Sequence, residues 1–385
     1  EGGRPSPRIR DVNRIPHRLL WCFASFSIFA LVGCGDDGEP SADPWGAEGF
    51  VPGEPLPITT DETWSFVPIE GSVCGDGTPS GLFVNATERS RELVLFLLGG
   101  GVCYDRATCA LMPREREGLG EDPLSYANLT AGIFDRDDPE NPFRDANFVV
   151  LPHCTGDFHL ADRVNDYPGI GEVHQRGHGN VKRALRRVAP TFADASRITF
   201  AGFSAGGVGV TGNYHLVASA FRAVGAPLPF LVNDGGPLLR PPYLGVKGQE
   251  TIAAAWGLED TLFRWCRRCK TDGFHEIFGR LHELYPELRS SVVCAYGDAV
   301  VVGLYTLMSG FGFVTASGGL EGGLLDFSDY TSTFPESTSG GAQREFFYES
   351  TRHGALVVGP LSETPGLADF LRAQLEGSGD FETVH

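Results

Sequence analysis

The fold is decided by the stretch RITFAGFSAGGVG, residues 197–209. Its first five residues favour a buried strand, and a helical segment follows from Gly206 to Phe221. Between them, Gly-Phe-Ser-Ala-Gly matches the pattern G-x-S-x-G, which is informative where a strand turns directly into a helix. The flanking glycines allow a sharp turn. Ser204, at the centre of the pattern, is therefore predicted to be a nucleophile held above the end of a strand.

Strand-like and helix-like segments alternate on both sides of this turn. Continuous apolar runs, typical of strands covered on both faces, occur at residues 93–98, 148–151 and 230–232. Helical segments are predicted at residues 178–188, 274–288 and 367–375. This alternation predicts an α/β fold of α/β-hydrolase type, with a mostly parallel central sheet and helices on both faces. Long lid-like loop excursions are expected at residues 102–146 and 300–343.

A serine nucleophile needs a base, and the base needs an orienting acid. In this fold the order along the chain is serine, acid, histidine. His353 follows a late predicted strand in a loop, where the base must come from. Asp298 ends the second strand after Ser204 and is the preferred acid. Asp234, which ends the first, is the alternative, and it could instead cap its own loop or line the pocket.

A developing oxyanion needs at least two converging N–H donors. The first should be Ala205, which follows the nucleophile and begins a helix. The second should come from the glycine-rich loop at residues 99–102, where backbone can approach a substrate closely. Gly101 and Val102 are the predicted donors of that loop.

Five motifs occur together in a fixed order. They are CGDGTP at 74–79, GGGVC at 99–103 with Cys109 beyond, HCTGD at 153–157 with His159 beyond, HGN at 178–180 and SAGG at 204–207. With these motifs the sequence resembles the pectin acetylesterase/Notum carboxylesterase family, over roughly residues 74–354.

The resemblance implies a Ser–Asp–His triad at Ser204, Asp298 and His353, without a metal or cofactor. It also implies the removal of short or fatty O-acyl groups from polysaccharides or proteins. The tryptophan of the family's glycine motif is replaced by Val102, which removes a bulky wall beside the oxyanion hole and affects the acyl-chain preference.

The resemblance further implies two disulfides, Cys103–Cys109 and Cys74–Cys154. Asp157, His159 and Asp234 are candidate residues of the substrate pocket.

The N-terminal segment is predicted to be a targeting signal. Basic residues precede an apolar run at residues 19–32 of signal-peptide length, and Leu-Val-Gly-Cys at 31–34 resembles a bacterial lipobox. We expect a signal peptide at residues 1–33, a lipidated Cys34 with a tether to residue 59, and one catalytic domain at 60–385. An ordinary cleaved signal with an incidental Cys34 is the alternative. Either reading predicts an exported protein, namely a bacterial cell-envelope lipoprotein or a secreted one.

The chain has nine cysteines, and seven remain beyond Cys22 and Cys34. An exported chain with this many cysteines is expected to hold disulfides, and the odd number leaves one thiol free. The pair Cys266 and Cys269 has no second pair at zinc-site spacing, so a structural bridge is favoured over zinc or redox chemistry. The partners of Cys266, Cys269 and Cys294 stay open.

The formal net charge of −18 makes nucleic acid a poor partner. It also disfavours polygalacturonate, so acetylated neutral glycans or small esters are better substrates. We predict a monomeric serine carboxylesterase that removes acetyl or other short acyl groups and touches the membrane only through Cys34. The alternatives are a serine peptidase on the same scaffold and a non-catalytic glycan-binding surface lipoprotein.

Overall fold

A computed structural model describes residues 43–385, apart from residues 47, 114–116, 310–317, 336 and 378. The predicted signal peptide and Cys34 lie outside the described residues, so the division at residues 33 and 59 stays a prediction. Across the described ranges, no helix is both long enough and apolar enough to span a bilayer.

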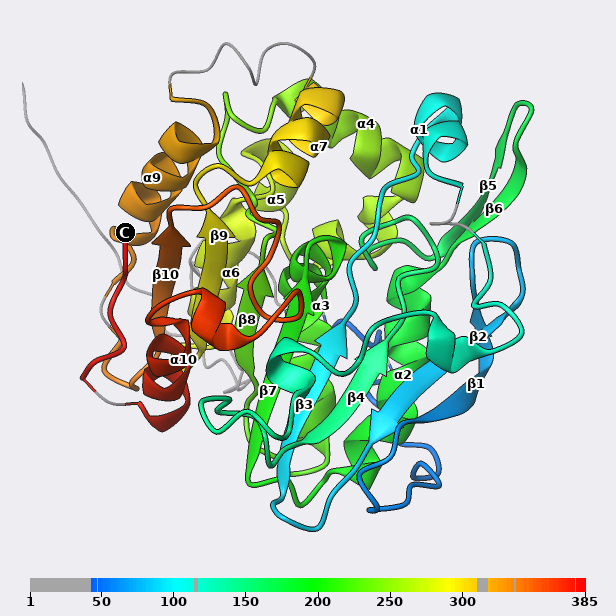
Figure 1. The fold of residues 1–385 in the computed structure, drawn as a ribbon. Helices are drawn as coiled ribbons and strands as arrows, with labels where there is room; N and C mark the ends of the chain where they lie inside the picture. The colour runs from blue at the N-terminus through cyan, green and yellow to red at the C-terminus, as the bar shows by residue number, and fades with distance from the viewer. Residues whose placement is uncertain (1–42, 47, 114–116, 310–317, 336, 378) are drawn as a thin grey trace, which may run out of the picture. The chain divides into compact units, whose positions relative to one another are not determined.

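One large sheet organises residues 65–348 (Figure 1). Within the described part of the chain it has eight strands, which in spatial order are β1 (Ser65–Val73), β2 (Pro79–Asn85), β4 (Asn147–Leu151), β3 (Glu92–Leu97), β7 (Arg197–Phe203), β8 (Phe230–Asp234), β9 (Arg289–Ala295) and β10 (Ala342–Tyr348). All neighbouring pairs from β4 to β10 are parallel. At the other edge, β1 runs antiparallel to β2, and β2 runs antiparallel to β4. The predicted mostly parallel, α/β-hydrolase-like sheet is confirmed.

Alternate side chains of the central strands enter two separate cores. Leu93, Leu95 and Leu97 of β3 pack with α2 (Gly177–Thr191) and α3 (Ala205–Ala223). Val94 and Phe96 face the other way, toward α10 (Leu367–Glu376) and residues 129–148. Because both faces are covered, these strands carry no polar side of the kind seen at a solvated sheet. Helices on both faces were predicted, although irregular chain covers much of the second face.

The remaining helices are short. They are α1 (Arg106–Leu111), α4 (Val246–Trp256), α5 (Arg268–Thr271), α6 (Glu276–Leu284), α7 (Ala299–Ser309) and α9 (Gly319–Thr331), with 3-10 turns at Pro123–Ser125, Gly132–Phe134, Leu258–Asp260, Leu262–Arg264 and Leu361–Glu363. A hairpin of β5 (Arg163–Tyr167) and β6 (Gly171–Gln175) stands apart from the sheet.

The excursion predicted as a loop at residues 300–343 is largely helical. It contains most of α7 and all of α9. Figure 1 shows α7 and α4 together beyond the carboxyl ends of the strands. The loop prediction failed because α7 is apolar nearly all round, so its sequence has no amphipathic periodicity. The predicted helix at 274–288 is limited to α6.

His159 is buried, and His178 and His282 are half-buried, where α2, α3 and α6 meet the sheet and the loops at its edge. Burial lowers the pKa of His159 to about 3, and it lowers the pKa values of His178 and His282 to about 4. Each ring is hydrogen-bonded, His159 to the Leu98 carbonyl at 3.0 Å and His282 to the Ser290 hydroxyl at 2.8 Å. The folded protein therefore holds these rings neutral, whereas the unfolded chain protonates them below about pH 6.5.

These histidines predict acid lability. Since the unfolded state binds more protons, stability is full above about pH 6.5 and is lost as the pH falls toward the folded pKa values. Each ring contributes a loss on the order of 2 kcal/mol at pH 5. We expect His282→Gln to reduce the difference in unfolding free energy between pH 7.5 and pH 5 by about that amount, measured by urea titration. His174→Gln, on the β6 hairpin strand, is the matched control, and an equal reduction there would contradict the assignment.

Candidate active site

Ser204 occupies a strained turn between β7 and α3. Its backbone has φ 57° and ψ −119°, a region that residues with a side chain rarely adopt. Its N–H donates to the Asp234 carbonyl at 2.6 Å. A Cβ atom on Gly206 would lie only 2.0 Å from the Leu97 carbonyl oxygen, so glycine there lets α3 start against β3. The turn predicted from G-x-S-x-G is therefore present, with the serine at its apex.

Asp298 and His353 are brought together from two neighbouring strands. Asp298 follows β9 and His353 follows β10, and the His353 Nδ1 atom lies 2.8 Å and 3.0 Å from the two carboxylate oxygens. Asp298 is fully buried, and its Oδ1 also accepts from the N–H groups of Val300 and Val301 at 3.0 Å. These amides begin α7, where the helix dipole favours a negative charge. An ionised carboxylate only accepts, so Nδ1 carries the proton and Nε2 is left with a lone pair.

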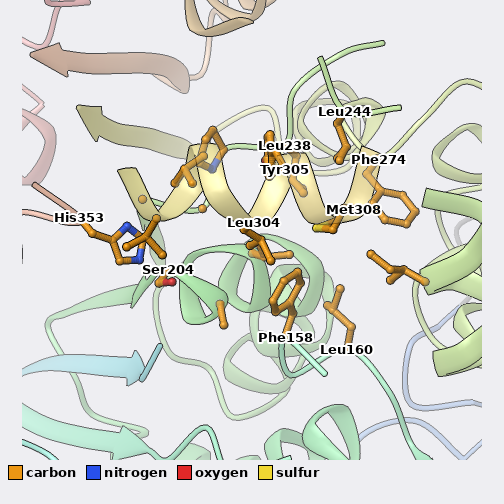
Figure 2. A pocket seen from close by; sticks show the side chains of 18 of the residues that line it. Phe158, Leu160, Ser204, Leu238, Leu244, Phe274, Leu304, Tyr305, Met308 and His353 are labelled. Atoms are coloured by element: carbon orange, nitrogen blue, oxygen red, sulfur yellow. The ribbon is translucent and has the colours of Figure 1, made fainter. Parts of the chain in front are cut away.

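The His353 ring lies beside Ser204 (Figure 2). Both residues line the same pocket. Among the described residues, the buried Nε2 atom of His353 has no hydrogen-bond partner. A free ring nitrogen next to a serine is the arrangement that a general base requires, even where the hydrogen bond itself forms only with substrate bound.

Asp234, the alternative acid, has a different place. It is fully buried at the end of β8, and its carboxylate accepts from the N–H groups of Ala355 and Leu356 at 2.8–3.0 Å. Burial raises its pKa to about 6, against the opposing effect of these two amides. Asp234 thus fixes the chain just after His353. It is not among the residues that line the pocket at Ser204, so the structure places it beside the predicted substrate pocket and not in its wall.

Asp157 and His159 are also buried rather than exposed to a pocket. Asp157 accepts from the Thr155 hydroxyl at 2.7 Å, the Gly177 amide at 2.8 Å and the His159 amide at 3.1 Å. Neither predicted pocket residue lines the pocket at Ser204. They hold the backbone of Phe158, which has φ 53° and does line it. Polarity suggested substrate contact, but these polar groups satisfy one another and the backbone.

The predicted oxyanion donors are placed unequally. Ala205 lines the pocket next to Ser204. Val102 is fully buried, and its N–H lies 3.1 Å from the Met112 sulfur atom. Neither Gly101 nor Val102 lines the pocket. A thioether is a weak acceptor, so a developing oxyanion could compete for this amide only if Met112 moved aside.

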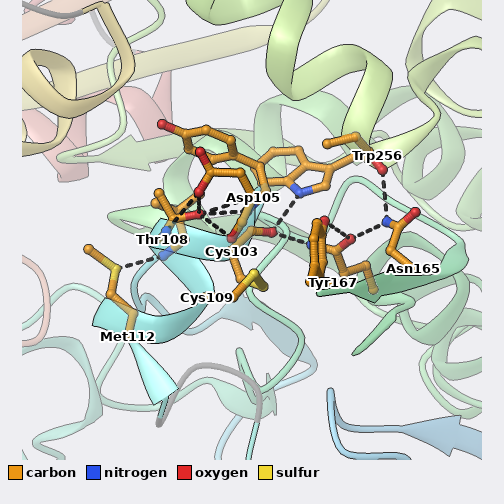
Figure 3. The surroundings of a disulfide bond; sticks show 12 residues. Cys103, Asp105, Thr108, Cys109, Met112, Asn165, Tyr167 and Trp256 are labelled. Atoms are coloured by element: carbon orange, nitrogen blue, oxygen red, sulfur yellow. Dashed lines mark hydrogen bonds between the residues drawn. A yellow bond between two sulfur atoms is a disulfide. The ribbon is translucent and has the colours of Figure 1, made fainter. Parts of the chain in front are cut away.

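The structure contains the two disulfides that the resemblance implies, Cys74–Cys154 and Cys103–Cys109. The second one anchors α1 to the loop after β3 (Figure 3). The Cys103 carbonyl accepts from the Trp256 indole at 3.0 Å, and the Cys103 amide donates to the Gly156 carbonyl at 2.8 Å.

A third bridge joins Cys266 and Cys269, and Cys294 is buried as a free thiol. This resolves the pairing that the sequence left open. In the described ranges, no three His, Cys, Asp or Glu side chains gather as possible metal ligands.

An apolar pocket leads away from Ser204. The space between its lining atoms is about 510 Å³, including its opening to solvent. Its wall is formed mainly by Phe158, Leu160, Leu238, Leu244, Ile252, Trp256, Phe274, Leu304, Tyr305 and Met308. Figure 2 shows Leu244 and Phe274 at the end opposite Ser204 and His353. The pocket residues that α4 and α7 contribute were not predicted, and the signal for them in the sequence was the apolar composition of 299–309.

Known proteins share both sequence and fold with this chain. A family model described as pectinacetylesterase matches residues 64–226. Palmitoleoyl-protein carboxylesterase NOTUM of Homo sapiens is 27% identical over 240 residues, which are 57% of this chain and 47% of the human protein. The Mus musculus protein of the same name is 28% identical over 161 residues, covering 40% of this chain and 31% of the mouse protein. The chain therefore spans less than half the length of these relatives.

The solved structure of the Wnt deacylase Notum from Drosophila aligns with a TM-score of 0.61 at 18% identity, covering 84% of this chain and 95% of that chain. At this identity the match concerns the fold. The resemblance indicated by the motifs is confirmed: this chain is similar to the pectin acetylesterase/Notum carboxylesterases in sequence, and it has the same α/β-hydrolase-like fold as Notum.

Proposed function

We propose that this protein is a carboxylic ester hydrolase with Ser204 as nucleophile, His353 as general base and Asp298 as the orienting acid. The observation that carries the proposal is the pair formed by the buried Asp298 and the half-buried His353, 2.8 Å apart, with His353 and Ser204 lining one apolar pocket. The names of the relatives support the same chemistry, since they are palmitoleoyl-protein carboxylesterases.

The reaction proceeds through an acyl-enzyme. His353 Nε2 takes the Ser204 proton as the hydroxyl attacks the ester carbonyl, and Asp298 stabilises the resulting imidazolium. The Ala205 amide, joined by Gly101 and Val102 once Met112 has moved, stabilises the oxyanion. His353 then protonates the departing alcohol, and water releases the acyl group from Ser204 by the same route.

The pocket indicates a longer acyl group than the one expected from the sequence. An acetyl group would occupy only the space next to Ser204 and would leave the apolar wall from Leu304 to Phe274 without a ligand. Each methylene placed there contributes about 0.8 kcal/mol of transfer free energy. We therefore propose a medium or long acyl chain in place of the acetyl or other short acyl group predicted from the sequence. The alcohol is a glycan, a protein hydroxyl or a small molecule.

We also propose that the protein is exported and acts as a monomer outside the cytoplasm, with Cys34 as its lipid anchor. Three disulfides in the described residues support an oxidising compartment. Mass spectrometry of the protein from membranes of a lipidating host would detect the acyl groups on Cys34.

Ser204→Ala tests the nucleophile. We expect p-nitrophenyl butyrate hydrolysis to fall to the background rate, because no other hydroxyl replaces the attacking oxygen. The melting temperature should change little, since alanine keeps the strained backbone. An unaltered rate in the folded variant would exclude Ser204 as nucleophile.

Asp298→Asn and Asp234→Asn form a matched pair that separates the two buried acids. Asp298→Asn should lower kcat by roughly 10³–10⁴-fold with a smaller effect on KM, because the imidazolium loses its partner. Asp234→Asn should mainly lower the unfolding free energy, by about 1–3 kcal/mol, because one of the two loop amides loses its acceptor. Steady-state kinetics and urea unfolding measure the two effects. The reverse pattern would make Asp234 the acid.

Ester chain length and bond type test the substrate class. We expect kcat/KM to rise from p-nitrophenyl acetate to octanoate, by about fourfold for each methylene that enters the pocket. Leu304→Trp, which narrows the pocket, should shift the preference back to acetate. Equal turnover of the matched p-nitroanilides would instead favour a peptidase. Absence of turnover with every ester would favour the non-catalytic binding protein.

A further inference from the structure

Two separate pockets share one wall at Phe274. The apolar pocket that begins at Ser204 ends at this ring. On the other side lies a second pocket, hereafter the outer pocket, which is bounded by α4, the 3-10 turns at 258–264 and the Cys266–Cys269 bridge. Phe274 is the residue that lines both. The proposed acyl site and the outer pocket therefore meet at this residue.

The backbone that carries this ring is held firmly. The Phe274 amide donates to the Gln249 side-chain oxygen at 2.7 Å, and the Gln249 amide group donates to the Leu244 carbonyl at 2.8 Å. Gln249 is itself buried in α4. One buried glutamine thus links Phe274 to Leu244 at the closed end of the acyl pocket. These bonds fix the backbone at Phe274, whereas its buried ring is held only by packing against neighbouring side chains such as Phe263.

The outer pocket can accept hydrocarbon. It encloses about 1000 Å³ of space between atoms, including its opening to solvent. Phe263 packs against Phe274 with ring centroids 6.2 Å apart, and Ala253 and Ala254 of α4 add further apolar surface. Charged side chains lie around it, among them Lys270 and Glu259, which form an ion pair at 2.5 Å. An apolar interior with a charged margin suits the end of an alkyl chain better than it suits a free carboxylate.

We propose that Phe274 is the residue that sets acyl-chain length, and that the outer pocket is a second binding site for the distal end of longer linear acyl chains. Shorter chains end against the ring. For longer chains the ring turns toward Phe263, and the last methylenes pass from the acyl pocket into the outer pocket. This inference rests on the proposed function, because it takes Ser204 as the point at which the acyl chain begins.

The experiment is a kcat/KM series with p-nitrophenyl esters from acetate to hexadecanoate, using the full chain. Phe274→Ala should move the most rapidly hydrolysed chain length upward, with about fourfold gained for each further methylene that is buried. Phe274→Trp should move it downward. Ala254→Trp, which fills the outer pocket from an exposed position, should lower the hexadecanoate-to-octanoate ratio at least tenfold. Leu111→Trp, a substitution at an exposed site in α1, is the matched control and should leave the series unchanged.

An unchanged preferred length in folded Phe274→Ala and Phe274→Trp would overturn the inference. So would an Ala254→Trp series identical to that of Leu111→Trp. If Phe274→Ala does not fold, Phe274→Leu takes its place and should show the same upward shift.

Failure of the proposed function is distinguishable, because the wild-type protein would then hydrolyse none of the esters. In that case calorimetric titration with free fatty acids from octanoate to hexadecanoate decides the inference. Long chains should bind at least tenfold more tightly to Phe274→Ala than to the wild-type protein. Equal affinities for the two proteins would overturn it.

Discussion

The close approach of α3 to its neighbours is the constraint on which the rest of the site depends. Glycine is a poor helix former, at about 1 kcal/mol relative to alanine, yet α3 contains several glycines on buried faces. At Gly206 the helix abuts the backbone of β3, and at Gly209 a Cβ atom would lie 2.9 Å from the Phe158 carbonyl oxygen. These glycines lower the helix propensity of α3, but they let the start of α3, the end of β3 and the Phe158 segment meet. Ser204 is lifted into its unusual backbone conformation by that contact.

Asp234 connects this turn to the histidine loop through two different parts of one residue. Its backbone carbonyl accepts the Ser204 amide, and its side chain accepts the amides that follow His353. Asp298 makes a second connection, because it binds His353 and also begins α7, whose Leu304, Tyr305 and Met308 side chains line the pocket. The groups proposed for chemistry and the wall proposed for acyl recognition are thus built on the same few backbone segments.

The sequence was a good guide wherever local chemistry determines structure. Continuous apolar strands, the G-x-S-x-G turn and the positions of Asp298 and His353 after late strands all led to the observed arrangement. It was a poor guide where tertiary packing decides. Asp157 and His159 are polar and were expected in the substrate pocket, but Asp157 is a buried acceptor of backbone amides and the buried His159 ring pairs with the Leu98 carbonyl. The apolar residues of α4 and α7 had no distinctive spacing, so their convergence on one pocket follows only from the three-dimensional fold.

The left-handed backbone at Ser204, Phe158 and His159 also matters for engineering. A non-glycine residue in such a region costs on the order of 1–3 kcal/mol, which the surrounding contacts must supply. A screen that rewards thermostability alone would favour glycine at these positions and would discard the serine hydroxyl or an aromatic wall of the pocket. At these positions, selection for heat resistance and selection for turnover would therefore favour different residues. Stabilising changes are better sought in segments remote from the start of α3.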